Sequence, residues 1–178
     1  MTAMLDDHGQ PSDEGSFAAA ERRIEVTRRR LRDYPDQLVR LTRMITHLQK
    51  RHTDMANAVL RPYELNYVTY TAMMMMYGSE EQTATPSELS EATGEKPTNI
   101  TRICDELLRK GLIERNPSTD DRRRVVVRLT REGERLVEQV QPELWRTLEQ
   151  VYGGLSAAEQ RQLIGLLRRP LQQLERLA

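Results

Sequence analysis

Residues 85–130 constrain the fold of this chain most, because they encode two short helices and a pair of strands in close succession. The first helix is expected to begin at Pro86, with Thr85 as its N-cap and Glu88 completing the sequence pattern of a capping box. Gly94 is of the residue type that commonly follows a helix end, so this helix spans only about two turns. A tight turn is predicted next, because a second helix begins within a few residues.

The second helix is predicted from Pro97 to Lys110 and is followed by Gly111. Apolar residues at three- and four-residue spacing give it one buried face: Ile100, Ile103, Cys104, Leu107 and Leu108. The open face of its first two turns carries short polar side chains and one guanidinium: Thr98, Asn99, Thr101, Arg102 and Asp105. Because Arg suits guanine and Asn suits adenine in the major groove of DNA, this face, apart from Asp105, is predicted to read bases.

The chain then changes to the period of β-structure. Strands are predicted at residues 112–115 and 125–129, and a turn is predicted over residues 116–121. Three consecutive arginines, residues 122–124, lie at the tip of this hairpin, where they are expected to follow a phosphate backbone or enter the minor groove. Two helices followed by such a hairpin predict a winged helix-turn-helix.

Five short motifs in this region together resemble the MarR (multiple antibiotic resistance regulator) family, most closely its multidrug-efflux repressor branch. The motifs are Pro86-Ser87-Glu88-Leu89, Thr98-Asn99-Ile100-Thr101-Arg102, Leu107 with Lys110-Gly111-Leu112-Ile113-Glu114-Arg115, Asp121-Arg122-Arg123, and Leu129-Thr130 with Gly133. The resemblance extends from about Asp36 to the C-terminus. It implies an ion pair between Asp121 and Arg123 that shapes the hairpin, which leaves Arg122 and Arg124 as the wing residues expected to contact DNA.

The distribution of charge supports a DNA-binding face, although the formal net charge of the chain is zero. Residues 79–95 hold five glutamates and no Lys or Arg, whereas residues 96–128 hold nine basic residues against five acidic ones. Ser87 and Lys96 lie near the starts of the two helices, where backbone N–H groups favour anions. Both are therefore predicted to contact phosphates.

Long amphipathic helices are predicted on both sides of this region. Their ranges are 17–32, 36–59, 66–78, 130–152 and 156–177. With 38% hydrophobic residues among 178, the chain has a thin apolar supply for one rounded core, so these helices are expected to pack against a second copy. A homodimer would place two recognition helices in successive major grooves of a pseudo-palindromic site in double-stranded DNA, as the resemblance also implies.

The predicted fold is mainly α with a small β-hairpin wing: a winged helix-turn-helix flanked by dimerisation helices from both chain ends. Its predicted domains are a disordered segment at 1–16, an N-terminal arm and dimerisation helix at 17–59, a DNA-binding domain at 60–130 and dimerisation helices at 131–178. Segment 17–32 carries six arginines. A solvated helix face and an arm reaching the partner subunit or DNA remain alternatives for it.

The sequence contains no motif of an enzyme or a metal site: no nucleophile elbow, P-loop, HExxH or zinc-spaced Cys/His cluster. We therefore expect a protein that is not an enzyme and needs no cofactor or metal. Cys104, the single cysteine, is interpreted as a small buried apolar residue, with oxidant sensing as the minor alternative. No apolar run reaches membrane-spanning length and no internal disulfide can form, so a cytoplasmic protein without membrane contact is expected.

Together these features predict a ligand-responsive transcriptional regulator, and the resemblance implies a repressor of efflux or aromatic-compound genes. A small aromatic or lipophilic acid is expected to bind between the dimerisation helices and the DNA-binding lobe and to favour a dimer geometry that no longer fits the DNA. Four residues are predicted to line its pocket: Met44, His47, Tyr70 and Met74. A rival interpretation is an interaction protein whose winged lobe binds another protein instead of DNA.

Overall fold

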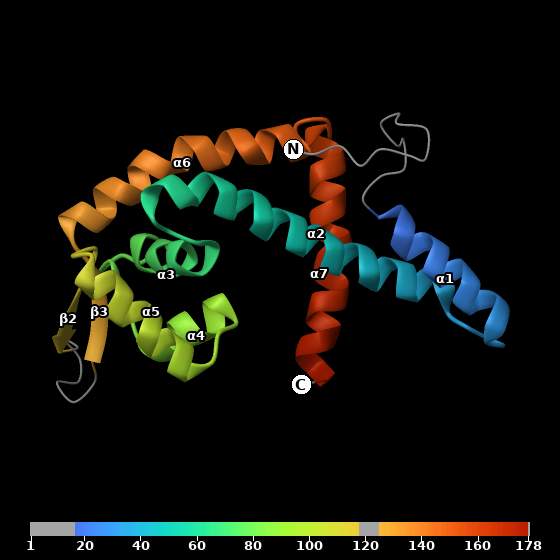
Figure 1. Ribbon diagram of the computed structural model, residues 1–178, viewed down its shortest axis with the longest axis horizontal. Helices are drawn as coiled ribbons and strands as arrows, with labels where there is room; N and C mark the ends of the chain where they lie inside the picture. Colours follow the sequence, from blue (N-terminus) through green and yellow to red (C-terminus); the bar gives the residue numbers. More distant parts are fainter. Residues whose placement is uncertain (1–16, 118–124, 178) are drawn as a thin grey trace. The chain divides into compact units, whose positions relative to one another are not determined.

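The computed structural model describes residues 17–117 and 125–177, which are drawn in colour in Figure 1. The chain divides into two compact units, Met1–Asp54 and Met55–Ala178. Within the described residues, seven α-helices accompany one small antiparallel sheet of three strands. The predicted fold class, mainly α with a winged helix-turn-helix, is confirmed.

The first unit holds α1 (Ala18–Arg30) and most of α2 (Asp36–Leu60). Ile24 on α1 is buried, and the ring of Phe17 packs against the ring of His47 with 5.6 Å between their centroids. Both helices were predicted from the apolar spacing of the sequence, and their ends differ from the predicted ones by no more than two residues.

The second unit contains the helix-turn-helix and the sheet. Its elements in chain order are the 3₁₀ turn η1 (Arg61–Tyr63), α3 (Tyr67–Tyr77), β1 (Thr83–Ala84), α4 (Pro86–Thr93), α5 (Pro97–Arg109), β2 (Ile113–Pro117), β3 (Val125–Leu129), α6 (Arg131–Tyr152) and α7 (Ala157–Leu177). The fully buried side chains come from the end of α2 and from α3, α4, α5, β3 and α6, and they include Leu60, Met73, Met76, Leu89, Ile100, Leu107, Val127 and Val137. Two adjacent methionines of the Met73–Met76 run therefore face solvent or the rim of the core, while its two ends are buried.

The helix ends follow the local signals of the sequence. Thr85 Oγ1 accepts a hydrogen bond from the N–H of Glu88, whose carboxylate accepts one from the N–H of Thr85 at 2.6 Å, so the predicted capping box is present. Gly94 and Gly111 adopt φ angles of +70° and +69°, which glycine reaches without steric cost. Consequently α4 and α5 end where the sequence predicts.

The sheet differs from the predicted hairpin in two respects. Its strand order is β1-β3-β2, and β1 pairs Thr83 with Arg128 at the outer edge of β3. A strand of two residues is too short to show an alternating pattern, so sequence analysis did not find it. The turn predicted over residues 116–121 does not include Asn116 or Pro117, because Asn116 pairs with Val126 and β2 continues through Pro117. Proline is tolerated there because β2 is an edge strand.

Thr130 joins the wing to the helix-turn-helix. Its hydroxyl donates to the carbonyl of Gly111 at 2.7 Å, and its backbone N–H donates to the carbonyl of Leu112 at 3.1 Å. The same hydroxyl oxygen accepts from the N–H of Gly133 and so caps α6. A single residue thereby connects the end of α5, the start of β2 and the start of α6.

The largest sets of exposed apolar side chains lie on two helices, α2 and α7. In the first unit, α2 exposes Leu38, Leu41, Ile45 and Leu48, each by 40–67%. In the second unit, α7 has no buried residue and exposes seven large apolar side chains by 38–74%: Leu163, Ile164, Leu166, Leu167, Leu171, Leu174 and Leu177. This much apolar surface is characteristic of a face that another subunit covers. None of the described helices combines the length and apolarity that a membrane span requires.

Gly133→Ala tests the joint around Thr130. A Cβ at position 133 would lie 2.2 Å from the carbonyl oxygen of Leu112 and 2.9 Å from the side chain of Leu129, so α6 would have to shift away from the wing. We expect a loss of about 1–3 kcal/mol in the free energy of unfolding, measured by denaturant titration. Gly154→Ala is the matched control, because a Cβ there meets no atom within 4 Å. Equal stability of both variants would contradict the close approach.

Candidate nucleic-acid interface

Helix α5 carries a buried apolar face and an exposed polar face. Its buried residues are Ile100, Ile103, Cys104 and Leu107. Of the predicted base readers, Thr98, Thr101 and Arg102 are exposed, whereas Asn99 is half-buried. The helix therefore presents three of the four predicted readers to solvent, and Asn99 lies at the edge of that face.

Polar contacts join Asn99 and Arg102 in a chain along one edge of α5. Asn99 Nδ2 donates to Glu95 Oε2 at 2.5 Å, and Arg102 Nε donates to Asn99 Oδ1 at 3.0 Å. Arg102 Nη1 lies 3.9 Å from Glu106 Oε2, and Lys110 Nζ lies 3.5 Å from Glu106 Oε1. Glu95 could not be predicted from the helical pattern, because it precedes α5 and takes no part in that pattern.

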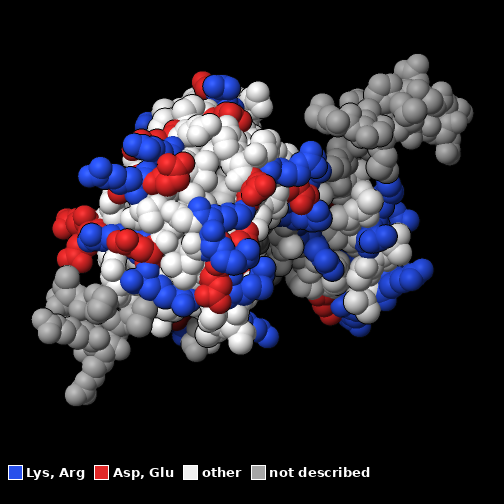
Figure 2. All heavy atoms as spheres, turned by 60° about the vertical axis from the view of Figure 1, so that its left-hand side comes forward, with Lys and Arg blue, Asp and Glu red and all other residues white. Residues whose placement is uncertain are grey.

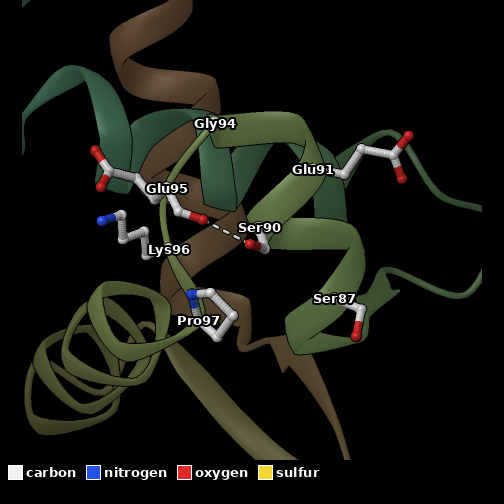
Figure 3. A pocket seen from close by; sticks show the side chains of 7 residues that line it. All are labelled: Ser87, Ser90, Glu91, Gly94, Glu95, Lys96 and Pro97. Carbon is white, nitrogen blue, oxygen red and sulfur yellow. Dashed lines mark hydrogen bonds between the residues drawn. The ribbon is translucent and has the colours of Figure 1, made fainter. Parts of the chain in front are cut away.

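A shallow open groove lies at the turn between α4 and α5 (Figure 3). Ser87 and Glu91 line it from α4, and Glu95 and Lys96 line it from the turn. Ser87 lies in the first turn of α4, and Lys96 is the N-cap of α5 and makes no side-chain capping bond. Both side chains are exposed at helix N-termini, as their predicted contact with phosphates requires.

The charge of this region is partly neutralised within the protein. Among the described residues of 96–128, six are basic and three are acidic. Arg115 Nη2 lies 2.7 Å from Asp105 Oδ1, so Asp105 is paired to the first strand of the wing. Over the left-hand part of Figure 2, Lys and Arg are interleaved with Asp and Glu.

The predicted wing residues Asp121, Arg122, Arg123 and Arg124 lie outside the described residues. Their predicted roles, an ion pair between Asp121 and Arg123 and DNA contacts by Arg122 and Arg124, stay predictions.

The arginines of α1 are partly paired on the helix itself. Arg28 and Arg29 both donate to the carboxylate of Glu25, at 2.8–3.0 Å. These hydrogen bonds lower the pKa of Glu25 to about 2. Arg23 and Arg30 line a different side of the helix, together with the half-exposed Val26. The two interpretations of this segment, a solvated face and an arm, both stay open.

The four predicted ligand-pocket residues lie in both units. Met44 and His47 belong to α2 in the first unit, where His47 contacts Phe17. Tyr70 and Met74 belong to α3 in the second unit, where both are partly buried against the core. Burial raises the pKa of Tyr70, and Met74 Sδ accepts a hydrogen bond from Gln141 Nε2 at 3.1 Å.

Gln141 also lines a small groove between α3 and α6. The groove is formed by Tyr77, Glu138, Gln141, Pro142 and Trp145. Tyr77 donates its hydroxyl hydrogen to Glu138 Oε1 at 3.2 Å, which raises the pKa of Tyr77. Trp145, the single tryptophan of the chain, is 61% exposed. Sequence analysis did not select these residues. Two features of the sequence could have indicated the groove. Glu138, Gln141 and Trp145 are spaced to lie on one side of α6, and the indole of Trp145 lies outside the apolar stripe of that helix.

No cluster of three or more His, Cys, Asp or Glu within 17–117 and 125–177 is arranged to hold a metal ion. Cys104 is 3% exposed, as its interpretation as a buried apolar residue requires. Burial raises the pKa of its thiol, which makes the reactive thiolate rarer at neutral pH. The alternative of oxidant sensing gains no support from this environment.

We expect a thiol reagent to modify native Cys104 slowly at pH 7. Burial limits access of the reagent to the sulfur, and the raised pKa of the thiol keeps the reactive thiolate rare. The rate should increase at higher pH and should rise by orders of magnitude in denaturant. A chromogenic disulfide reagent measures both rates, since the chain has one cysteine. A native rate equal to the denatured rate would show that the thiol is accessible and would return oxidant sensing to consideration.

Known proteins resemble this chain in sequence and in fold. The sequence model of the MarR family matches residues 65–125. The transcriptional repressor MprA of Escherichia coli (strain K12) is 34% identical over 164 residues, which cover 92% of this chain and 93% of MprA. The Escherichia coli regulator PrsX is 31% identical over 127 residues, covering 71% of this chain and 76% of PrsX.

Solved structures share the same architecture. A mutant of MarR from Escherichia coli complexed with operator DNA matches with a TM-score of 0.67 and 26% identity, covering 79% of this chain and 99% of that one. AbsC from Streptomyces coelicolor has a TM-score of 0.69 at 20% identity, over 83% of this chain and 98% of its own, and shows the fold alone.

Proposed function

The chain belongs to the MarR family, and we propose that it is a DNA-binding transcriptional regulator that acts as a homodimer and responds to a small ligand. The observation that carries the proposal is α5, a helix with one buried face and an exposed polar face on which Arg102 is held by hydrogen bonding. The operator complex of the similar MarR protein supports the same use of this fold.

The proposed homodimer follows from the exposed apolar helices. Burial of apolar surface contributes about 25 cal/mol per Å², so α2 and α7 favour association strongly if a second copy covers them. A two-fold dimer then carries two copies of α5 and requires a pseudo-palindromic operator. Repression is the role of the similar MprA, and we extend it to this chain together with efflux or aromatic-compound genes as targets.

The proposed ligand is a small aromatic or lipophilic molecule, and the expectation from the sequence is that it is an acid. The α3–α6 groove supports an aromatic guest, because Tyr77, Pro142 and Trp145 supply apolar walls. A ligand that binds better to a dimer unable to match the operator spacing would release the DNA by shifting the population towards that state. Glu138 opposes an anionic guest, so binding of an acid is expected to be weak until that charge is removed.

Substitution of two arginines separates base reading from backbone contact. Arg102→Ala is expected to cost about 1–3 kcal/mol of binding free energy and to relax the preference at one base pair. Arg122→Ala is expected to weaken binding to all sequences and to reduce the slope of log K against log salt by roughly one. Fluorescence anisotropy on a duplex selected from a randomised pool, over a salt series, measures both.

Arg135→Ala is the matched control, because this exposed arginine lies on α6, outside the proposed interface, and pairs with Glu132. It should bind like the wild type. An Arg102→Ala variant that keeps wild-type affinity and base preference would refute the assignment of α5 as the recognition helix.

The groove is tested by calorimetric titration with salicylate in the absence of DNA. Trp145→Ala should weaken binding at least about tenfold, because it removes an aromatic wall worth roughly 1.5 kcal/mol or more. Glu138→Gln should strengthen binding, since the opposing charge is gone. Leu148→Ala, an exposed apolar residue of α6 outside the groove, serves as the control. Equal affinities in all three variants would exclude the groove as the ligand site.

A further inference from the structure

We propose that Glu95 is a positioning residue for base recognition: acting through Asn99, it fixes the orientation in which Arg102 is presented to the major groove. The proposal rests on the proposed DNA-binding function and adds to it a residue outside the recognition helix. Three observations carry it: the contacts of the Asn99 amide, the donors left unused on Arg102, and the anchoring of Glu95 to α4.

The amide of Asn99 has one possible orientation between its two neighbours. A carboxylate only accepts hydrogen bonds and a guanidinium only donates them, so Nδ2 must face Glu95 and Oδ1 must face Arg102. Rotation of the amide by half a turn would place Oδ1 against the carboxylate and Nδ2 against the guanidinium. Two hydrogen bonds would then be replaced by two repulsive contacts, so Glu95 determines which amide atom meets Arg102.

The contact with Asn99 leaves the terminal edge of Arg102 available for DNA. Nε is the atom that donates to Asn99, while Nη1 lies 3.9 Å from Glu106, beyond hydrogen-bond distance. The side chain is 68% exposed. Nη1 and Nη2 can therefore reach O6 and N7 of a guanine together. A guanidinium held in place before binding loses less side-chain entropy when it makes that contact.

Glu95 is itself held by α4. Its backbone N–H donates to Thr93 Oγ1 at 3.3 Å, and its carbonyl accepts from Ser90 Oγ at 2.5 Å, the contact drawn in Figure 3. Glu95 also directly follows Gly94, whose positive φ ends α4. The path of polar contacts therefore runs from the first helix of the motif, through the turn, to the guanidinium on the second helix.

The proposal changes the role expected of Asn99. Its carbonyl oxygen and one amide hydrogen already have partners inside the protein, so only the second lone pair of Oδ1 and the second hydrogen of Nδ2 remain for a base, in an orientation set by the internal bonds. We therefore expect Asn99→Ala to weaken the base preference at the same position of the DNA site as Arg102→Ala does. A separate adenine position that disappears in Asn99→Ala would contradict this assignment.

Glu95→Gln is the decisive variant. The new amide can also donate, so it removes both the charge and the requirement that Nδ2 of Asn99 face position 95. Base preferences are obtained by selection from a pool of randomised duplexes, followed by anisotropy titration of single-base variants. We expect Glu95→Gln to lower the preference at the position read by Arg102 by about tenfold, within the range of one bidentate contact.

Glu91→Gln is the matched control, because Glu91 lines the same groove and loses the same charge without contacting Asn99. Removal of either carboxylate should strengthen binding to non-specific duplexes to a similar, small extent, since each repels phosphates. Only Glu95→Gln should change the base preference. Thermal unfolding of each variant confirms that the fold is retained.

A double variant supplies the rescue. In Glu95→Gln/Asn99→Asp, the amide at position 95 donates to a carboxylate at position 99, which can still accept from Arg102 Nε. Position 99 again accepts a hydrogen bond from Arg102, and the negative charge has moved from position 95 to position 99. The preference at the base pair read by Arg102 should therefore return. A purely structural role for Glu95 predicts no such rescue.

The remaining outcomes separate this proposal from the proposed function. If Arg102→Ala weakens the base preference at one position of the duplex and Glu95→Gln leaves that preference unchanged, Glu95 is not a positioning residue, while base reading by α5 stands. If Glu95→Gln sharpens the preference, the Glu95–Asn99 bond competes with DNA and the proposal is wrong. If neither variant alters any position, base reading by α5 fails together with it.

Discussion

Thr130 makes the contacts on which the arrangement of the DNA-binding lobe depends. Its hydroxyl and N–H bind consecutive carbonyls, those of Gly111 and Leu112, at the point where α5 gives way to β2. Its hydroxyl also caps α6 through Gly133, where the backbone approaches Leu112 so closely that a Cβ would lie 2.2 Å from the carbonyl oxygen. Hydrogen bonds to one threonine and the close approach at Gly133 therefore help to set the direction of β2 relative to α5, together with the Arg115–Asp105 pair.

Local signals made most of the helical structure predictable from the sequence. The capping boxes that begin α4 and α7 and the glycines that end α4 and α5 act within four residues, so a pattern of residue types identifies them. The sheet was less predictable, because strand pairing depends on residues distant in sequence. Pairing with β3 turns Thr83–Ala84 into a strand, and it extends β2 through an Asn-Pro pair that is typical of a turn.

The candidate site also has features that local sequence patterns predict and features that depend on contacts between elements. Helical spacing predicted the exposure of Thr98, Thr101 and Arg102, since burial of one face of α5 determines the other. The half-buried state of Asn99 was not predictable, because Glu95 lies in the turn and its side chain folds back along the helix. The groove with Trp145 depends on how α3 packs against α6, which neither helix encodes by itself.

Dimerisation is the step through which all of these features would become a regulator. The second unit presents one polar helix face with Arg102, and the exposed apolar side chains of α2 and α7 need a second copy to cover them. Two recognition helices related by a two-fold axis match DNA only when their separation equals one turn of the double helix or a whole multiple of it. Binding should therefore depend on the spacing of half-sites as strongly as on their sequence.

The most direct test is an anisotropy titration against duplexes that carry two selected half-sites with centres about 10 or about 15 base pairs apart, one turn or one and a half turns of DNA. The account predicts two chains per duplex at the shorter spacing and an affinity at least about tenfold lower at the longer one, where the half-sites face opposite sides of the helix. Equal affinity at both spacings, or one chain bound per duplex, would contradict a dimer that reads successive major grooves.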